Sequence, residues 1–457
     1  MYTASKETIN SWPWPEFPLF LHLYIPEEDE EEADDFRAVL RQRNRIRGIQ
    51  VFMVGPDANW FVKLMGEDFP RLRDLDLTAE EIDDPNDVPY ISFARFLGGP
   101  VPSLQHLSID NFEYEGLLSL LSSAPNLISL EIKNIRLACY LSLEEMVGAL
   151  ARLPKLRELI VSFWLDIPTH KFHNVMEFHR KSPRSLTRAF LPSLTKLQIG
   201  GEDEYLENLI HLIHAPRLKG LHVKYLKPGR DEDKLRAGNL SQFISRTETF
   251  KYAQFRRAEV TLSQFATSVV LDLPRDEHQQ ARLSHIIADK VWSTPFIDTV
   301  SHMANFLGQL VIMLSDVRHL SINYYGKGMM GEYGVPIKNI DWVLLLRSFS
   351  AVELLHVHGE VVKHVASALK DIPEEVVAQV LPALQLLWLD DGDQDKGEGK
   401  GNPESVDRFL SLRKQSGRPV AFVNSREEFI EILNPHQLEL SQSPRKISAD
   451  GYEWDKR

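Results

Sequence analysis

Residues whose spacing could support catalysis form only incomplete signatures in this chain. Gly326–Gly331 has the outer glycines of a phosphate-binding loop, but Glu332 and Tyr333 stand where that loop needs lysine and serine or threonine. The run Gly397-Glu-Gly-Lys-Gly401 lacks the third glycine of a dinucleotide-binding fingerprint and lies in a charged stretch. We interpret both segments as plain loops. The chain also contains no Gly-x-Ser-x-Gly elbow and no His-Glu-x-x-His motif.

Metal and thiol chemistry are also weakly supported. His170 with His173, and His211 with His214, have the spacing of one helix face, but a zinc site needs three or four ligands and neither pair has a carboxylate that completes one. Cys139 is the only cysteine, which excludes an intrachain disulfide framework and a cysteine-cluster metal site. We therefore predict no catalytic residues, no metal site and no cofactor, and we expect that the protein is not an enzyme.

Composition narrows the class of protein and of partner. The chain has 457 residues, too many for one ordinary compact core, so it suits two or three domains or one elongated repeat array. It contains 52 Lys and Arg against 65 Asp and Glu, a net charge of −13 that argues against a nucleic-acid partner. The most apolar long stretch, Pro295–Leu314, is interrupted by polar residues and predicts an amphipathic helix. With no signal peptide visible, we expect no membrane partner and a cytoplasmic or nuclear location.

An internal repeat runs through most of the chain. Its pattern is Pro-x-Leu-x-x-Leu-x-aliphatic, and full copies begin at Pro70, Pro102, Pro125, Pro154, Pro192, Pro216 and Pro382. Degenerate copies begin at Ser315 and Ser350, and Ile46–Val51 is an opening copy without its proline. Proline begins each segment, and the residues after it alternate between apolar and polar, which predicts a short strand with one buried face.

Helical patterns separate the copies. They cover Asn59–Met65, Glu115–Ser122, Ser142–Leu153, Asp203–His214, Asp341–Phe349 and Glu374–Val380. Ser142 and Glu145 form the signature of a capping box at the start of one helix. Units of strand, loop and helix stack because none can bury its leucines alone. The predicted fold class is therefore α/β, a leucine-rich-repeat solenoid with a parallel sheet on its concave face.

The predicted solenoid is an irregular horseshoe of roughly ten units. Between Pro70 and Pro216, the spacing of successive prolines ranges from 23 residues (Pro102 to Pro125) to 38 residues (Pro154 to Pro192), whereas uniform leucine-rich repeats keep to roughly 20–29. Asn111 and Asn134 lie only near the position of the asparagine ladder in regular arrays.

Three regions are predicted. Residues 1–40 form an N-terminal segment with the acidic run Glu27–Asp35, which we interpret as solvated, with recruitment of a basic partner as the alternative. Residues 41–433 form the array, with a divergent section at 226–310 and a flexible loop at 392–403. The divergent section still predicts adjacent strands at Arg257–Leu262 and Ser268–Leu273, joined by a polar turn, which we interpret as a divergent repeat and its partner hairpin. Residues 434–457 form a polar tail.

The chain resembles the fungal F-box/leucine-rich-repeat proteins of mushroom-forming species. The resemblance covers most of the chain and is carried by runs that begin at Arg45 (Arg-Ile-Arg-Gly-Ile), Phe69 (Phe-Pro-Arg-Leu-Arg-Asp-Leu), Phe96 (Phe-Leu-Gly-Gly-Pro-Val-Pro-Ser-Leu), Glu204 (Glu-Tyr-Leu-Glu-Asn-Leu-Ile), Gln242 (Gln-Phe-Ile-Ser-Arg-Thr) and Ser416 (Ser-Gly-Arg-Pro-Val). It implies a target-recognition subunit of a cullin-RING ubiquitin ligase, in which F-box helices bind the adaptor and repeats bind the target. It implies no cofactor and no catalytic residue.

The chain departs from that family at its start. Trp12–Pro18 contains three prolines, which block the helix bundle of an F-box, and a short apolar run and the acidic stretch follow. We expect that the sequence starts downstream of the F-box, through a truncated gene model or loss of that part. A cullin adaptor is then a partner only if an F-box lies upstream, and the alternative is a stand-alone repeat scaffold with no ubiquitin role.

Binding residues are predicted from strand alternation. Side chains that point away from the leucines must line the inner face, where we expect a protein target to bind. In the first half these are Asp74, Asp76, His106, Glu131, Glu158 and Lys196, and in the second half His222, His319, Leu354, His356, Leu386 and Trp388. The second set has the composition of a binding hot spot. The alternative, left open, is that Ser405–Arg413 or Pro419–Val423 folds over it as a cap.

Overall fold

The structure is a computed structural model, and it describes fourteen stretches of the chain. These are residues 17–25, 39–54, 59–80, 88–93, 96–136, 139–163, 187–227, 238–251, 254–263, 266–272, 286–290, 296–325, 338–390 and 406–423. Several sequence predictions fall outside them: the acidic run, the glycine-containing segments at 326–331 and 392–403, the pair His170 and His173, and the polar tail.

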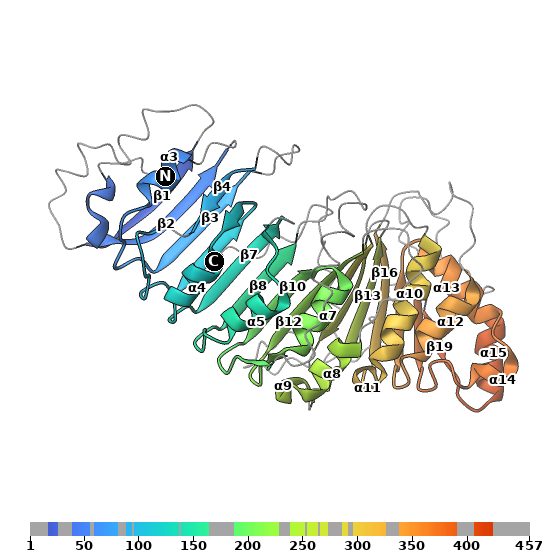
Figure 1. Cartoon of the computed structure of the whole chain (residues 1–457). Coiled ribbons are helices and arrows are strands. Elements are labelled where there is room, and N and C mark those ends of the chain that lie inside the picture. The colour runs from blue at the N-terminus through green and yellow to red at the C-terminus, as the bar shows by residue number, and fades with distance from the viewer. Residues whose placement is uncertain are drawn as a thin grey trace.

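One 15-stranded sheet dominates the described part of the chain (Figure 1). In spatial order its strands are β1 (Leu19–Ile25), β2 (Ile46–Met53), β3 (Asp74–Ala79), β5 (His106–Asp110), β7 (Ser129–Ile135), β8 (Glu158–Phe163), β10 (Lys196–Gly201), β12 (Gly220–Lys227), β15 (Ile286–Lys290), β14 (Ala266–Asp272), β13 (Arg257–Ser263), β16 (His319–Tyr325), β17 (Leu354–His358), β18 (Leu386–Asp390) and β19 (Ala421–Val423). Two minor sheets pair β4 (Tyr90–Ser92) with β6 (Glu113–Glu115) and β9 (Ala189–Phe190) with β11 (Ile213–His214).

Helices lie along one side of the main sheet, with α4, α5, α7, α8 and α10 in succession (Figure 1). The described helices are α3 (Asn59–Leu64), α4 (Leu117–Ser123), α5 (Leu143–Leu150), α7 (Asp203–His211), α8 (Gly238–Arg246), α9 (Glu248–Lys251), α10 (Phe296–Gln309), α11 (Val311–Leu314), α12 (Asn339–Arg347), α13 (Val361–Lys370), α14 (Glu374–Val377) and α15 (Asp407–Gln415), with a 3-10 turn at Arg43–Arg45. The chain is thus mixed α/β with a largely parallel, open sheet whose edges are β1 and β19.

Each repeat copy supplies one strand, as predicted, and the copies pair in register. Leu75 of β3 lies opposite Leu107 of β5, which lies opposite Leu130 of β7. The same alignment joins Leu355 of β17 to Leu387 of β18. Because equivalent leucines stand side by side, they form continuous rows on one face of the sheet.

The predicted hairpin in the divergent section interrupts the parallel order of the main sheet. Strand β14 runs antiparallel to both neighbours, β13 and β15. Only two residues separate Ser263, the last of β13, from Ala266, the first of β14. A connection this short closes a hairpin, whereas a parallel pair needs a crossover of a dozen or more residues. The adjacent strands predicted at Arg257–Leu262 and Ser268–Leu273 are confirmed as this hairpin.

The repeat proline lies before the strand rather than at its first position. The amide of Leu72 donates to the carbonyl of Phe69 (3.1 Å), which closes a turn with Pro70 at its second position, and β3 begins only at Asp74. Equivalent bonds run from Leu104 to Val101 (3.0 Å) and from Leu384 to Leu381 (3.0 Å). The fixed φ of proline suits the second position of such a turn. The proline therefore shapes the entry to each strand.

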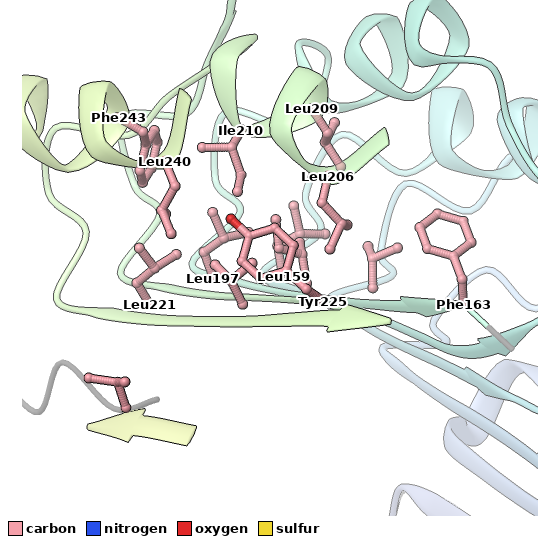
Figure 2. Close-up of a cluster of buried hydrophobic side chains, with 14 of the residues drawn as sticks. Leu159, Phe163, Leu197, Leu206, Leu209, Ile210, Leu221, Tyr225, Leu240 and Phe243 are labelled. Carbon is pink, nitrogen blue, oxygen red and sulfur yellow. The ribbon is translucent and has the colours of Figure 1, made fainter. Parts of the chain in front are cut away.

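Buried leucines, isoleucines and valines fill the layer between sheet and helices. Figure 2 shows the layer from the side, with Leu159, Leu197 and Leu221 on the strands below helices α7 and α8. These three leucines are at most 1% exposed.

The predicted helix at Pro295–Leu314 is present as α10 and α11, with Phe306 and Leu307 buried and Asn305 exposed. Within the described residues, no helix is both long and apolar enough to span a bilayer.

Asparagines tie the ends of successive strands together. Asn111 is buried at positive φ (59°), and its side-chain amide donates to the carbonyl of Glu80 one repeat earlier (2.6 Å). Asn134 also has positive φ (51°) and donates to the Asp110 carboxylate (2.8 Å). Asparagine tolerates the left-handed region better than most residues. These residues thus make contacts between repeats although the repeat lengths are irregular.

Two charged residues, the buried Glu207 and the half-buried Arg246, link helices α7 and α8. Glu207 of α7 accepts hydrogen bonds from the amides of Asn239 (2.7 Å) and Leu240 (3.3 Å) at the start of α8, and from the Tyr225 hydroxyl (2.6 Å). Arg246 at the end of α8 donates to the carbonyls of Ile210 and His211 at the end of α7 and of Ile213 in β11 (2.7–2.8 Å). Each side chain satisfies backbone groups that its partner helix cannot pair internally.

Glu207→Gln tests this link. Its amide would place a donor among the helix N–H donors, so we expect a loss of about 1–3 kcal/mol in the free energy of unfolding, measured by urea denaturation. The matched control is Glu204→Gln, an exposed position on the same helix, for which a change within about 0.5 kcal/mol is expected. Equal effects of the two substitutions would contradict the role of Glu207.

Candidate binding surface

Strand side chains that point away from the helices form a second face of the main sheet, here named the open face. On β3, Asp74, Asp76 and Thr78 are half-buried while the intervening Leu75, Leu77 and Ala79 are buried. The same alternation holds on β5 and on β17. Because the backbone is pleated, every second side chain of a strand lies on the open face. Because the strands pair in register, side chains at equivalent positions of neighbouring strands lie side by side and form a row across the sheet.

The N-terminal part of the open face, on strands β3 to β10, carries the six polar residues predicted for the first half. Asp74, Asp76, Glu131, Glu158 and Lys196 are half-buried, and His106 is exposed. Asp110 and Lys133 lie on the same face, so five carboxylates stand against two lysines on these strands. Burial raises the pKa of Asp110, against the opposing effect of Lys133. The surface is therefore acidic and partly desolvated.

Hydrogen bonds between neighbouring strands order these side chains. The Gln50 side chain contacts His22 Nδ1 (2.7 Å) and donates to Asp76 (3.0 Å), which links β1, β2 and β3 along one register row. One row away, His106 Nδ1 lies 2.5 Å from Asp74. Such contacts fix the side chains in position before any partner binds.

The six binding residues predicted for the C-terminal half of the chain also lie on the open face, but their side chains differ in solvent exposure. His222 and Leu386 are only 7% and 8% exposed, so the expectation that both would be free for contact is wrong. His319, Leu354, His356 and Trp388 are half-buried. Burial lowers the pKa of His319, and the nearby Arg257 lowers it further. This part of the face is more tightly packed than the N-terminal part.

Five polar and aromatic residues on strands β16, β17 and β18 form a compact group near the C-terminal edge of the open face, here named the histidine–tryptophan cluster: Ser321, His356, His358, Trp388 and Asp390. The His356 ring stacks on Trp388 with centroids 3.8 Å apart and planes 12° from parallel. His358 Nδ1 lies 3.1 Å from an Asp390 carboxylate oxygen, and His356 Nδ1 lies 3.5 Å from Ser321 Oγ. Burial lowers the pKa of His356 to about 4, so its ring is neutral at pH 7.

The proposed cap segments take two different places. Pro419–Val423 contributes β19, which pairs with β18, and Val423 is fully buried against Leu386, with Leu354 and Trp388 packed on this pair. Most of Ser405–Arg413 falls in α15, which contacts helices α13 and α14. The first segment therefore covers Leu386 at the edge of the sheet, while His356 and Trp388 keep part of their surface exposed.

The structure also places residues that the sequence analysis did not select. Strand β1, within the segment predicted to precede the array, extends the main sheet and carries Phe20 and Tyr24 on the open face. Tyr24 stacks on Phe52 of β2 (5.8 Å between centroids), and all three rings are exposed. The alternation in Leu19–Ile25 was the available signal. His358 and Asp390 were also not predicted, although each lies two residues after a predicted residue on the same strand, His356 on β17 and Trp388 on β18.

Other candidate residues are placed away from any shared site. His211 ends α7 and His214 lies in β11 stacked on Phe190, so the predicted single helix face for this pair is wrong.

Cys139 is buried, and burial raises the pKa of its thiol to about 11, which leaves it protonated and unreactive. A shallow pocket of about 670 Å³ lies at the strand-entry turns beside the sheet and includes Arg157, Arg217 and Lys219 in its lining.

Comparisons with known proteins assign no family to this chain. No protein family matches the sequence, and neither does any curated protein. Among solved structures, the chain is similar to the crystal structure of the leucine-rich repeat-containing protein LegL7 from Legionella pneumophila, at 12% identity and a TM-score of 0.28. That match covers 88% of this chain and 99% of the other. The fold described above therefore rests on strand order and register alone.

Trp388→Ala tests how far this residue is structural. Removing the indole exposes Leu386 and Val423 and unstacks His356, so we expect a loss of about 1–3 kcal/mol, less than for a fully buried tryptophan. The measurement is the shift in urea midpoint. Phe52→Ala, which removes an exposed stacked ring at the other end of the sheet, should cost about 1 kcal/mol or less. An unchanged midpoint for Trp388→Ala would show that the indole does not support the fold.

Proposed function

We propose that this protein binds other proteins through the open face of its sheet and is not an enzyme. The observation that carries the proposal is the face itself, a set of aligned rows of half-buried polar and aromatic side chains opposite the helices. A broad surface with ordered side chains offers many weak contacts to a polypeptide. The acidic N-terminal part favours a partner with a basic contact surface.

In the same proposal, the chain is an irregular leucine-rich-repeat solenoid with the open face on its concave side. The repeat motif, the parallel pairing of successive copies and the asparagine contacts between repeats support this arrangement. We place the protein in the cytoplasm or nucleus, on the grounds of its single cysteine.

The more specific role is target recognition for a cullin-RING ubiquitin ligase of the F-box type. Its support is the resemblance of the sequence runs at Phe69, Phe96 and Glu204 to fungal F-box/leucine-rich-repeat proteins. A stand-alone repeat scaffold with no ubiquitin role is the second candidate, because the runs that carry the resemblance lie in the repeat array, which a scaffold would share.

Charge reversal on the open face tests the recognition role. Partners cross-linked to the chain in cells are purified, and their affinities are measured for the wild type and for Glu131→Lys combined with Glu158→Lys. We expect at least about a tenfold loss of affinity, because both carboxylates lie in the acidic part of the face.

The matched control combines Glu374→Lys with Glu375→Lys on helix α14, which changes the net charge equally at exposed positions on the opposite side. Its affinities should stay within twofold of the wild type. Equal losses for both double variants would indicate non-specific attraction and contradict binding at the open face.

A second experiment separates the two candidate roles. The chain is expressed from its complete reading frame and co-purified with the cullin adaptor. A stable one-to-one complex supports the ligase role. Absence of the adaptor from a preparation that still binds its target through the open face would favour the scaffold.

A further inference from the structure

The histidine–tryptophan cluster contains three groups of the kind that bind transition metals. One ring nitrogen each from His356 and His358 and one carboxylate oxygen of Asp390 lie within 4.8 Å of one another. They come from two adjacent strands, with His358 directly opposite Asp390 in the register and His356 two residues before His358. Two imidazoles and a carboxylate are the protein ligands of many zinc sites that keep an open coordination position.

The geometry is close to what zinc requires. Zinc bonds of about 2.0–2.1 Å in a tetrahedron place neighbouring ligand atoms about 3.3 Å apart. His358 Nδ1 and the Asp390 oxygen are already 3.1 Å apart. The side chains of His358 and Asp390 are 31% and 35% exposed, so they can rotate to close the remaining distance and an ion can reach them from solvent.

His356 is held ready by its surroundings. Stacking on Trp388 fixes the plane of the ring, and its Nδ1 faces Ser321 Oγ at 3.5 Å. The other nitrogen, Nε2, is buried and has no hydrogen-bond partner among the described residues. Buried polar atoms without partners are rare and costly, so this nitrogen is suited to a ligand that the protein itself does not supply. Outer contacts like that of Ser321 orient metal-bound histidines in known sites.

We propose that His356, His358 and Asp390 bind a zinc ion on the open face, with at least one coordination position left for water or for a side chain of a bound protein. Imidazole and carboxylate ligands favour zinc and its neighbours in the transition series over magnesium or calcium. The site goes beyond general protein recognition, because it adds one directional bond to an otherwise broad contact surface.

The test is calorimetric titration of the full chain, freed of metal by a chelator, with zinc chloride and no protein partner present. We expect saturable binding that is about 100-fold weaker in His358→Ala and in the near-isosteric Asp390→Asn, at the upper end of the loss that removal of an outer contact causes. The matched control is His106→Ala, which removes a histidine on the same face that pairs with the Asp74 carboxylate on the neighbouring strand. It should bind zinc within twofold of the wild type.

Cobalt gives a second readout that does not depend on heat. Bound Co²⁺ should show the visible absorption of a tetrahedral nitrogen and oxygen site in the wild type and in His106→Ala, but not in Asp390→Asn. Circular dichroism of each variant confirms that it is folded. No zinc binding by the wild type, or equal binding by the wild type and both ligand variants, would overturn the proposal. Because no partner is present, either result leaves the recognition function standing.

Discussion

The structure depends on the burial of leucine rows between one long sheet and the helices beside it. No single strand of five to eight residues could bury its apolar face alone, and each copy is covered only when its neighbours lie beside it and a helix lies above. Full burial of one leucine contributes roughly 1.5–3 kcal/mol, and equivalent positions such as Leu75, Leu107 and Leu130 repeat this gain along the sheet. The in-register pairing of strands follows, because a slip of one residue would turn every leucine outward.

That constraint also creates the open face. Pleating alternates side chains strictly, so placing every second residue in the core places the others together on the opposite side. Polar groups such as Gln50 and Asp76, or His358 and Asp390, then lie beside each other on adjacent strands and form hydrogen bonds. The register of strand pairing therefore determines which polar groups meet on the open face. Residues separated by about 30 positions in sequence become neighbours about one strand spacing apart.

Helix ends leave backbone groups unpaired, and the edge of the sheet leaves apolar side chains uncovered, so both need additional contacts. Glu207 accepts hydrogen bonds from unpaired amides at the start of α8, and Arg246 donates to unpaired carbonyls at the end of α7; Glu207 is buried and Arg246 is half-buried in these positions. The cost of that burial is visible at Arg246, where burial lowers the pKa to about 10. At the C-terminal edge, β19 covers Leu386 with Val423, which closes the apolar part of the face and leaves the histidine–tryptophan cluster beside it partly exposed.

The sequence by itself determined the local pattern: the repeat of Pro-x-Leu-x-x-Leu, the strand at each copy, the capping box at Ser142 and Glu145, and which residues alternate outward. These features depend on spacing within about a dozen residues, which sequence shows directly. Tertiary structure alone decided the place of the β13–β14 hairpin between β15 and β16, the place of β1 in the sheet, the burial of His222 and Leu386, and the meeting of His356 and His358 with Asp390. Each depends on which strand lies next to which, and that order is set by the packing of distant segments rather than by local spacing.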